Sequence, residues 1–320
     1  MLLVVIGHAI QSLIRDDCYD NHLWNIIYSF HMPAFMALSG WLLFKGENMP
    51  LVAWGGYLSQ VKRRFGQLII PYILWSIIKI TLAGNISINS LVDIILYPDK
   101  TFWFLWALFW IYLLFTILQQ ISSRIKISET ALVVSFGFVL MIVMSLSEAR
   151  LFGIQFITYY FLFYSLGYII HRFDILHYIN IIITTVLFFI WLFMAWYWNM
   201  HSLPCWMPKV PIIPISILQY IYRGLTAVFA TLILLYISER WLDCKNSINN
   251  FVTWTGKVSL GIYVIHLILL GFVTEILLLL NFDVAANIVL SAVIAYLISI
   301  ISVHLLMRNN VTAKYLLGKF

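Results

Sequence analysis

Charged residues are scarce in this sequence. Of its 320 residues only 10% are Asp, Glu, Lys or Arg, and 63% are hydrophobic, whereas about 25% of the residues of a soluble domain are charged. So few charges cannot cover the surface of a soluble domain of this length. The apolar residues also fall into runs of roughly twenty, the length that crosses a hydrocarbon core of about 30 Å. The composition therefore predicts an integral membrane protein.

Several chemical signatures are also missing. The three cysteines Cys18, Cys205 and Cys244 form neither a disulfide framework nor a metal-ligand spacing, so we expect no metal. The net charge of +6 comes from basic residues that mostly stand singly between apolar runs, which argues against nucleic acid as a partner. A G-x-S-x-G elbow and a convincing Ser-His-Asp set are both lacking, which disfavours a hydrolase-type acyl-enzyme.

The apolar runs predict an all-α polytopic membrane protein, a single domain over residues 1–320. We expect ten transmembrane helices near 1–13, 23–44, 66–84, 102–121, 130–147, 153–170, 178–198, 215–236, 257–280 and 284–306. The first run has no basic leader and no cleavage site, so it does not resemble a signal peptide. As a helix it spans only about 20 Å, and we expect a first transmembrane helix that is shortened at its cytoplasmic end.

The basic residues predict the orientation, because cytoplasmic loops collect Lys and Arg. With a cytoplasmic N-terminus, thirteen of the nineteen basic residues fall on the inner side. They are Lys45, Lys62, Arg63, Arg64, Arg124, Lys126, Arg172, Arg240, Lys245, Lys257, Arg308, Lys314 and Lys319. The other six, which include Lys209, fall on the outer side or at outer helix ends. This asymmetry favours both termini in the cytoplasm.

Two histidines lie at membrane depth in the first two helices. His8 is about five residues, and His31 about eight residues, from the outer helix end, so both lie roughly 8–12 Å below the outer boundary. Ionisable groups at this depth are functional candidates, although each histidine could merely hydrogen-bond to a neighbouring helix. Pro33 removes the hydrogen bond to the Ser29 carbonyl and predicts a kink that places an imidazole beside a freed carbonyl.

Further polar candidates lie on other helices. Arg63 and Arg64 either anchor the topology or bind an anion such as a phosphate of coenzyme A. Tyr263 and His266 are three residues apart and therefore share a helix face. Arg223 and Glu275 occupy a similar outer depth, and we expect them to form an ion pair because pairing lowers the cost of charges in the membrane.

Five motifs in order give a resemblance to a known family. They are Val4-Val5-Ile6-Gly7-His8, Phe30-His31-Met32-Pro33-Ala34-Phe35 with Ser39-Gly40, Arg63-Arg64 before Pro71-Tyr72, Trp103-Phe104-Leu105, and Gly261-Ile262-Tyr263 with His266. Together they cover nearly the whole chain, which resembles the membrane-bound acyltransferase 3 family, in the branch related to fucose O-acetylases.

The resemblance implies a multipass protein of the bacterial inner membrane. Such a protein passes an acyl group, usually acetyl from cytoplasmic acetyl-CoA, to a hydroxyl of a cell-surface carbohydrate or its lipid-linked precursor. His8 matches the histidine that the family requires, and neutral imidazole suits a general base. The family's basic residue eleven positions before that histidine would precede residue 1. Where the family often has Arg-x-x-Arg, Arg64 is followed three residues on by Gln67.

Two other classes of function remain open on the sequence. A transporter or flippase for lipid-linked sugar would suit ten helices with buried charges, although it would favour paired broken helices in two related halves, and we find no such repeat. A membrane scaffold or sensor would use the histidines as pH switches. Hydrolysis of acetyl-CoA by the purified protein separates the enzyme from both alternatives.

Overall fold

A computed structural model describes residues 1–44, 54–147, 149–207, 213–242, 247–280 and 282–319. Lys45, Lys209, Cys244 and Lys245 lie outside these described residues. The helices are α1 (Leu2–Ile14), α2 (His22–Tyr28), α3 (His31–Trp41), α4 (Trp54–Leu82), α5 (Ile88–Leu96), α6 (Trp103–Ile125), α7 (Glu129–Ser145), α8 (Ile154–Arg172), α9 (Ile181–Trp196), α10 (Ile215–Leu242), α11 (Ser247–Lys257), α12 (Ser259–Leu279), α13 (Val284–Leu306) and α14 (Asn310–Leu317). Short 3₁₀ turns η1 (Arg15–Asp20), η2 (Pro98–Lys100), η3 (Leu151–Gly153) and η4 (Ile175–Tyr178) connect some of them.

Each of the ten predicted apolar runs is helical in the structure. Six described helices are long and apolar enough to cross a membrane: α4, α6, α8, α10, α12 and α13. The other predicted runs correspond to the shorter helices α1, α7 and α9 and to the pair α2–α3. The protein is therefore all-helical over its described residues and carries several membrane-spanning helices. The short helices α5, α11 and α14 were not predicted.

The second predicted helix is broken, as Pro33 indicates. α2 ends at Tyr28 and α3 begins at His31, with Phe30 in a non-helical conformation between them. Pro33 occupies the first turn of α3, where its missing N–H leaves no bond unmade. The break frees carbonyl groups at the end of α2 and turns the chain just before His31.

Helices α3 and α8 pack in unusually close contact. A Cβ atom added to Gly167 would lie 1.8 Å from the carbonyl oxygen of Ala37, and one added to Gly40 would lie 1.9 Å from the carbonyl oxygen of Tyr164. Only glycine allows two helix backbones to approach so closely, a packing that membrane helices often use. The contact fixes α3, and with it His31, against the rest of the bundle.

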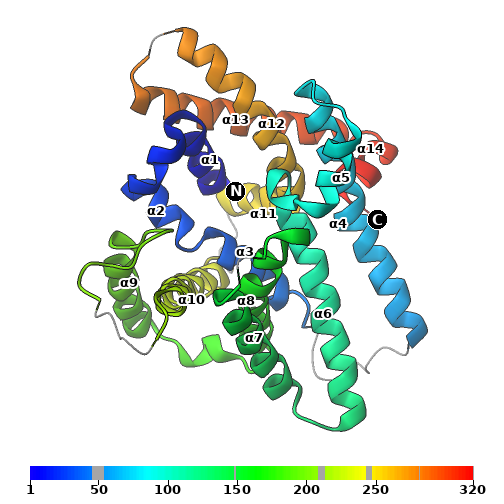
Figure 1. Cartoon of the computed structure of the whole chain (residues 1–320), viewed down its shortest axis with the longest axis vertical. Coiled ribbons are helices and arrows are strands. Elements are labelled where there is room, and N and C mark those ends of the chain that lie inside the picture. The colour runs from blue at the N-terminus through cyan, green and yellow to red at the C-terminus, as the bar shows by residue number, and fades with distance from the viewer. Residues whose placement is uncertain (45–53, 148, 208–212, 243–246, 281, 320) are drawn as a thin grey trace.

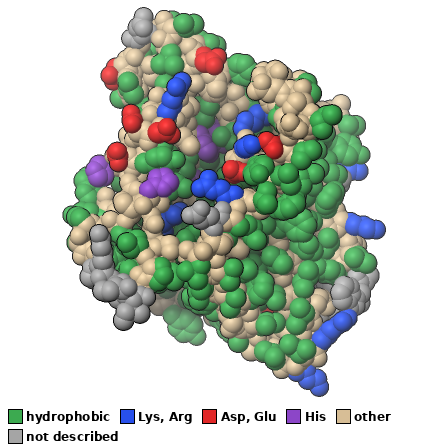
Figure 2. All heavy atoms as spheres, viewed as in Figure 1, with side chains coloured by type: hydrophobic (Ala, Val, Ile, Leu, Met, Phe, Trp, Pro, Cys, Tyr) green, Lys and Arg blue, Asp and Glu red, His purple; other side chains and the backbone are tan. Residues whose placement is uncertain are grey.

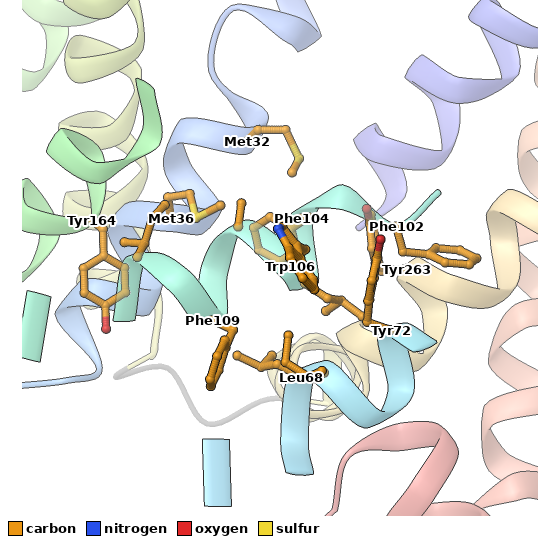
Figure 3. Packing of buried hydrophobic residues seen from close by; sticks show 14 of the residues in the cluster. Met32, Met36, Leu68, Tyr72, Phe102, Phe104, Trp106, Phe109, Tyr164 and Tyr263 are labelled. Atoms are coloured by element: carbon orange, nitrogen blue, oxygen red, sulfur yellow. The ribbon is translucent and has the colours of Figure 1, made fainter. Parts of the chain in front are cut away.

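The main core surrounds α6, which lies between α3 and α8 on one side and α4 and α12 on the other (Figures 1 and 3). Figure 3 shows Met32 and Met36 of α3 facing the aromatic side chains of α6, while Tyr72 and Tyr263 approach from α4 and α12. α4 begins at Trp54, twelve residues before the predicted start, so Arg63 and Arg64 are helical.

Candidate functional site

His8 projects from the middle of α1 toward the end of α2. The hydroxyl oxygen of Tyr28 lies 3.4 Å from Nδ1 of His8, and that hydroxyl donates to Oε1 of Gln11 at 2.9 Å. Gly7 makes this approach possible, because an added Cβ would lie 2.8 Å from the Tyr28 ring. Sequence reasoning missed Tyr28 and Gln11. The available signal was spacing: Gln11 is three residues after His8 and therefore shares its helix face.

His31 lies on the other side of Tyr28. The two rings are 4.6 Å apart in an edge-to-face arrangement, and the side chain of His31 is 4% exposed. Nδ1 of His31 lies 2.8 Å from the carbonyl oxygen of Ile27, one of the groups freed by the break between α2 and α3. The carbonyl beside the imidazole is therefore that of Ile27, whereas the sequence pointed to that of Ser29.

His266 of α12 completes the group. Its ring centroid is 5.5 Å from that of His8 and 6.0 Å from that of Tyr263, and it is fully buried. Nδ1 of His266 lies 2.8 Å from the carbonyl oxygen of Ile262, while Nε2 is buried without a hydrogen-bond partner among the described residues. We call His8, Tyr28, His31 and His266 the histidine cluster.

Hydrogen bonding assigns the tautomers in this cluster. A carbonyl oxygen only accepts, so Nδ1 of both His31 and His266 carries a proton. Both residues are buried, and because burial disfavours the charged ring, Nε2 of each keeps its lone pair. The single proton of the Tyr28 hydroxyl points to Gln11, so Nδ1 of His8 is the donor to the tyrosine oxygen, and in the neutral ring Nε2 of His8 is unprotonated. The cluster therefore presents neutral imidazoles, which can accept a proton from a hydroxyl group.

Arg63 and Arg64 line a separate cavity of about 1090 Å³ at the opposite end of α3. The eleven residues of α3, from His31 to Trp41, correspond to roughly 16 Å of helix, so the cavity and the histidine cluster lie at opposite ends of this helix. Its walls come from the end of α3 and from α4, α6, α7 and α8. We call it the basic cavity.

Two further cations and one carboxylate line the basic cavity. Lys126 and Arg172 join Arg63 and Arg64 in its wall. Arg172 donates to Glu129 in an ion pair of 2.6 Å, and Glu129 also accepts from Gln119 at 2.6 Å. Among the described residues, four basic side chains against one carboxylate leave the wall positively charged, which suits a ligand with several phosphates. The sequence did not indicate Lys126 or Arg172 as ligands, because the four cations of the wall come from three separate elements: α4, the end of α6 and the end of α8.

The predicted ion pair between Arg223 and Glu275 is wrong. The described residues contain ion pairs of Lys100 with Asp93 and of Arg172 with Glu129, and none between these two. Glu275 is exposed on α12, whereas the guanidinium of Arg223 lies among aromatic rings. Equal depth on two helices does not bring side chains together when they point in different directions.

Comparison with known proteins assigns the chain to a family. The model of the acyltransferase 3 family, described as an acyltransferase domain, matches residues 1–307. The chain therefore belongs to this family of membrane acyltransferases.

Two relatives match part of the chain. Nodulation protein NolL of Mesorhizobium japonicum is 30% identical over 178 residues, which are 52% of this chain and 44% of the relative. Nodulation protein NolL of Sinorhizobium fredii is 34% identical over 116 residues, 33% of this chain and 30% of the relative. The matches thus span less than half the length of these relatives. No solved structure matches the chain.

Proposed function

We propose that this protein transfers an acetyl group from cytoplasmic acetyl-CoA to a hydroxyl of a cell-surface carbohydrate or its lipid-linked precursor. The observation that carries the proposal is the pairing of two sites along α3, with neutral imidazoles at one end and the basic cavity at the other. The cavity would hold the phosphates of the donor, and the histidine cluster would receive the acceptor.

The reaction needs a base and a path for the thioester. Nε2 of His8 accepts the hydroxyl proton while the acceptor oxygen attacks the thioester carbonyl carbon. The C–S bond breaks, the coenzyme A thiolate takes up a proton, and an ester is released. A positioned base of this kind contributes about 10²–10⁴-fold. Met32 and Met36 belong to α3, which has His31 at one end and the basic cavity at the other, and Figure 3 shows them facing the aromatic rings of α6. Their flexible side chains suit a passage for the acyl-bearing arm of acetyl-CoA.

The proposed orientation places both termini in the cytoplasm of a bacterial cell, with ten crossings of the inner membrane. The charge asymmetry supports it, and so does the position of the basic cavity, because coenzyme A is cytoplasmic. The carbohydrate acceptor would then approach the histidine cluster from outside. A reporter fused after Asn309 is expected in the cytoplasm, and an outer signal from it would contradict the orientation.

The function is tested with purified protein in lipid nanodiscs and acetyl-CoA labelled in the acetyl group. Release of free coenzyme A is expected with the parent protein, together with label in surface polysaccharide when membranes containing acceptor are supplied. A transporter or sensor would release no coenzyme A. Intact acetyl-CoA after prolonged incubation, with and without acceptor membranes, would overturn the proposal.

A further inference from the structure

Arg223 is a cation inside an apolar helix long enough to cross a membrane, and it has no anionic partner among the described residues. It lies eight residues into α10, roughly 12 Å along the helix. Among the described residues no carboxylate lies within 4.0 Å of its guanidinium, and its Nε is buried without a hydrogen-bond partner. A charge at this depth is costly unless it is compensated, so the position calls for an explanation.

Aromatic rings surround the guanidinium. Its central carbon is 5.3 Å from the ring centroid of Tyr159, 5.5 Å from that of Trp198 and 6.0 Å from that of Tyr220. Such contacts contribute about 0.5–2 kcal/mol each, but a π-face accepts no bidentate hydrogen bond. The planar donor fork of arginine is therefore held in place while its N–H groups remain available to an incoming group.

A chain of aromatic ring contacts connects this arginine to the histidine cluster. Tyr28 of the cluster stacks on Trp24 at 3.8 Å, and the ring of Trp24 is 6.3 Å from that of Trp198, on which Arg223 rests. The intervening chain is fixed, because Asn199 donates to the carbonyl of Tyr19 at 3.0 Å and Gln219 donates to that of Met200 at 3.0 Å. Figure 2 shows Lys, Arg and His side chains, with several Asp and Glu side chains among them, in the upper middle of one face.

We propose that Arg223, held by Tyr159, Trp198 and Tyr220, forms an oxyanion-binding subsite for the acyl acceptor. The anion would be either the carboxylate of an acidic sugar or the phosphate of a lipid carrier, since both present paired oxygens to the guanidinium fork. This inference rests on the proposed function, in which the acceptor is a carbohydrate reaching the histidine cluster. The aromatic rings would pack against the apolar face of the same acceptor.

The test measures binding rather than transfer, so it stands apart from the test of the activity. Purified protein in phosphatidylcholine nanodiscs is titrated with methyl glucuronide against methyl glucoside, and with polyprenyl phosphate against polyprenol. We expect one anionic probe to bind at least about tenfold more tightly than its neutral counterpart, as a charge-assisted hydrogen bond allows. The pair that shows the preference identifies the source of the anion.

Three variants test whether Arg223 causes the preference for the anionic probe. Arg223→Gln is expected to reduce it to below about twofold, and Arg223→Lys, which keeps the charge but loses the fork, to reduce it by about threefold or more. Arg150→Gln is the control, because Arg150 is exposed, and it should keep the full preference. Equal binding of both probe pairs by the parent protein would overturn the subsite, as would an unchanged preference in Arg223→Gln or its loss in Arg150→Gln. If Arg223→Gln does not fold, an unchanged preference in Arg223→Lys is the overturning result.

Discussion

Replacing Gly167 by alanine tests the contact that holds α3. The new Cβ would lie 1.8 Å from the Ala37 carbonyl oxygen, whereas ordinary contact begins at 3.4 Å. Both atoms belong to rigid helices, so α3 and α8 must part by about 1.5 Å or distort, and overpacking of this kind costs about 1–3 kcal/mol. Because α3 carries His31 at one end and borders the basic cavity at the other, activity should fall together with stability.

Gly271→Ala provides the matched control. Gly271 is inside α12, and an added Cβ would have no neighbour within 4 Å, so alanine should be neutral or stabilise the helix by up to about 1 kcal/mol. The assay is thermal unfolding in one detergent, followed by size-exclusion chromatography, with acetyl transfer measured below the lower transition. A Gly167→Ala protein that melts as late as the parent would refute the close α3–α8 contact.

Three other predictions follow from the sites. Tyr28→Phe removes the hydroxyl next to His8 and Gln11. Acetyl transfer should drop about tenfold at unchanged expression, which is the effect of one lost hydrogen bond. Undiminished transfer would show that this hydroxyl does not position His8. Arg64→Ala should raise the KM for acetyl-CoA by about tenfold or more. Lys62→Ala should leave it unchanged, because Lys62 is exposed and lies outside the cavity wall. Equal effects of the two variants would show that surface charge in general, and not the cavity, determines the KM. Glu275→Gln should change stability by less than about 0.5 kcal/mol because Glu275 is exposed. A loss of several kcal/mol in thermal unfolding would show that Glu275 has a charged partner after all.

Helix positions were largely predictable because the bilayer imposes a run length on every crossing. The break before His31 was predictable too, since Pro33 cannot continue an uninterrupted hydrogen-bond ladder. The short helix α5 was not, because it lies between two crossings and starts with a local capping box of Ser87 and Ser90, a signal that resembles ordinary loop composition.

The candidate site was only partly predictable, because it depends on which helices become neighbours. Depth along the chain suggested that His8 and His31 share one site, and the structure shows Tyr28 in contact with both. Depth carries no information on direction, so the same reasoning paired Arg223 with Glu275 wrongly. The ring contacts of Arg223 come from α8, from α10 itself and from the residues after α9, and the sequence gives no register between these helices.

The most direct test of the mechanism is acetyl transfer by His8→Ala. In cells that lack the native gene, O-acetyl content of the surface polysaccharide is measured and normalised to the amount of protein in the membrane, with the parent protein as reference. We predict a loss of about 10²–10⁴-fold at normal expression and membrane insertion, and a smaller loss for His31→Ala, whose Nδ1 is held by the Ile27 carbonyl. Near-normal acetylation by a well-expressed His8→Ala variant would contradict the account and would move the base to His31 or His266.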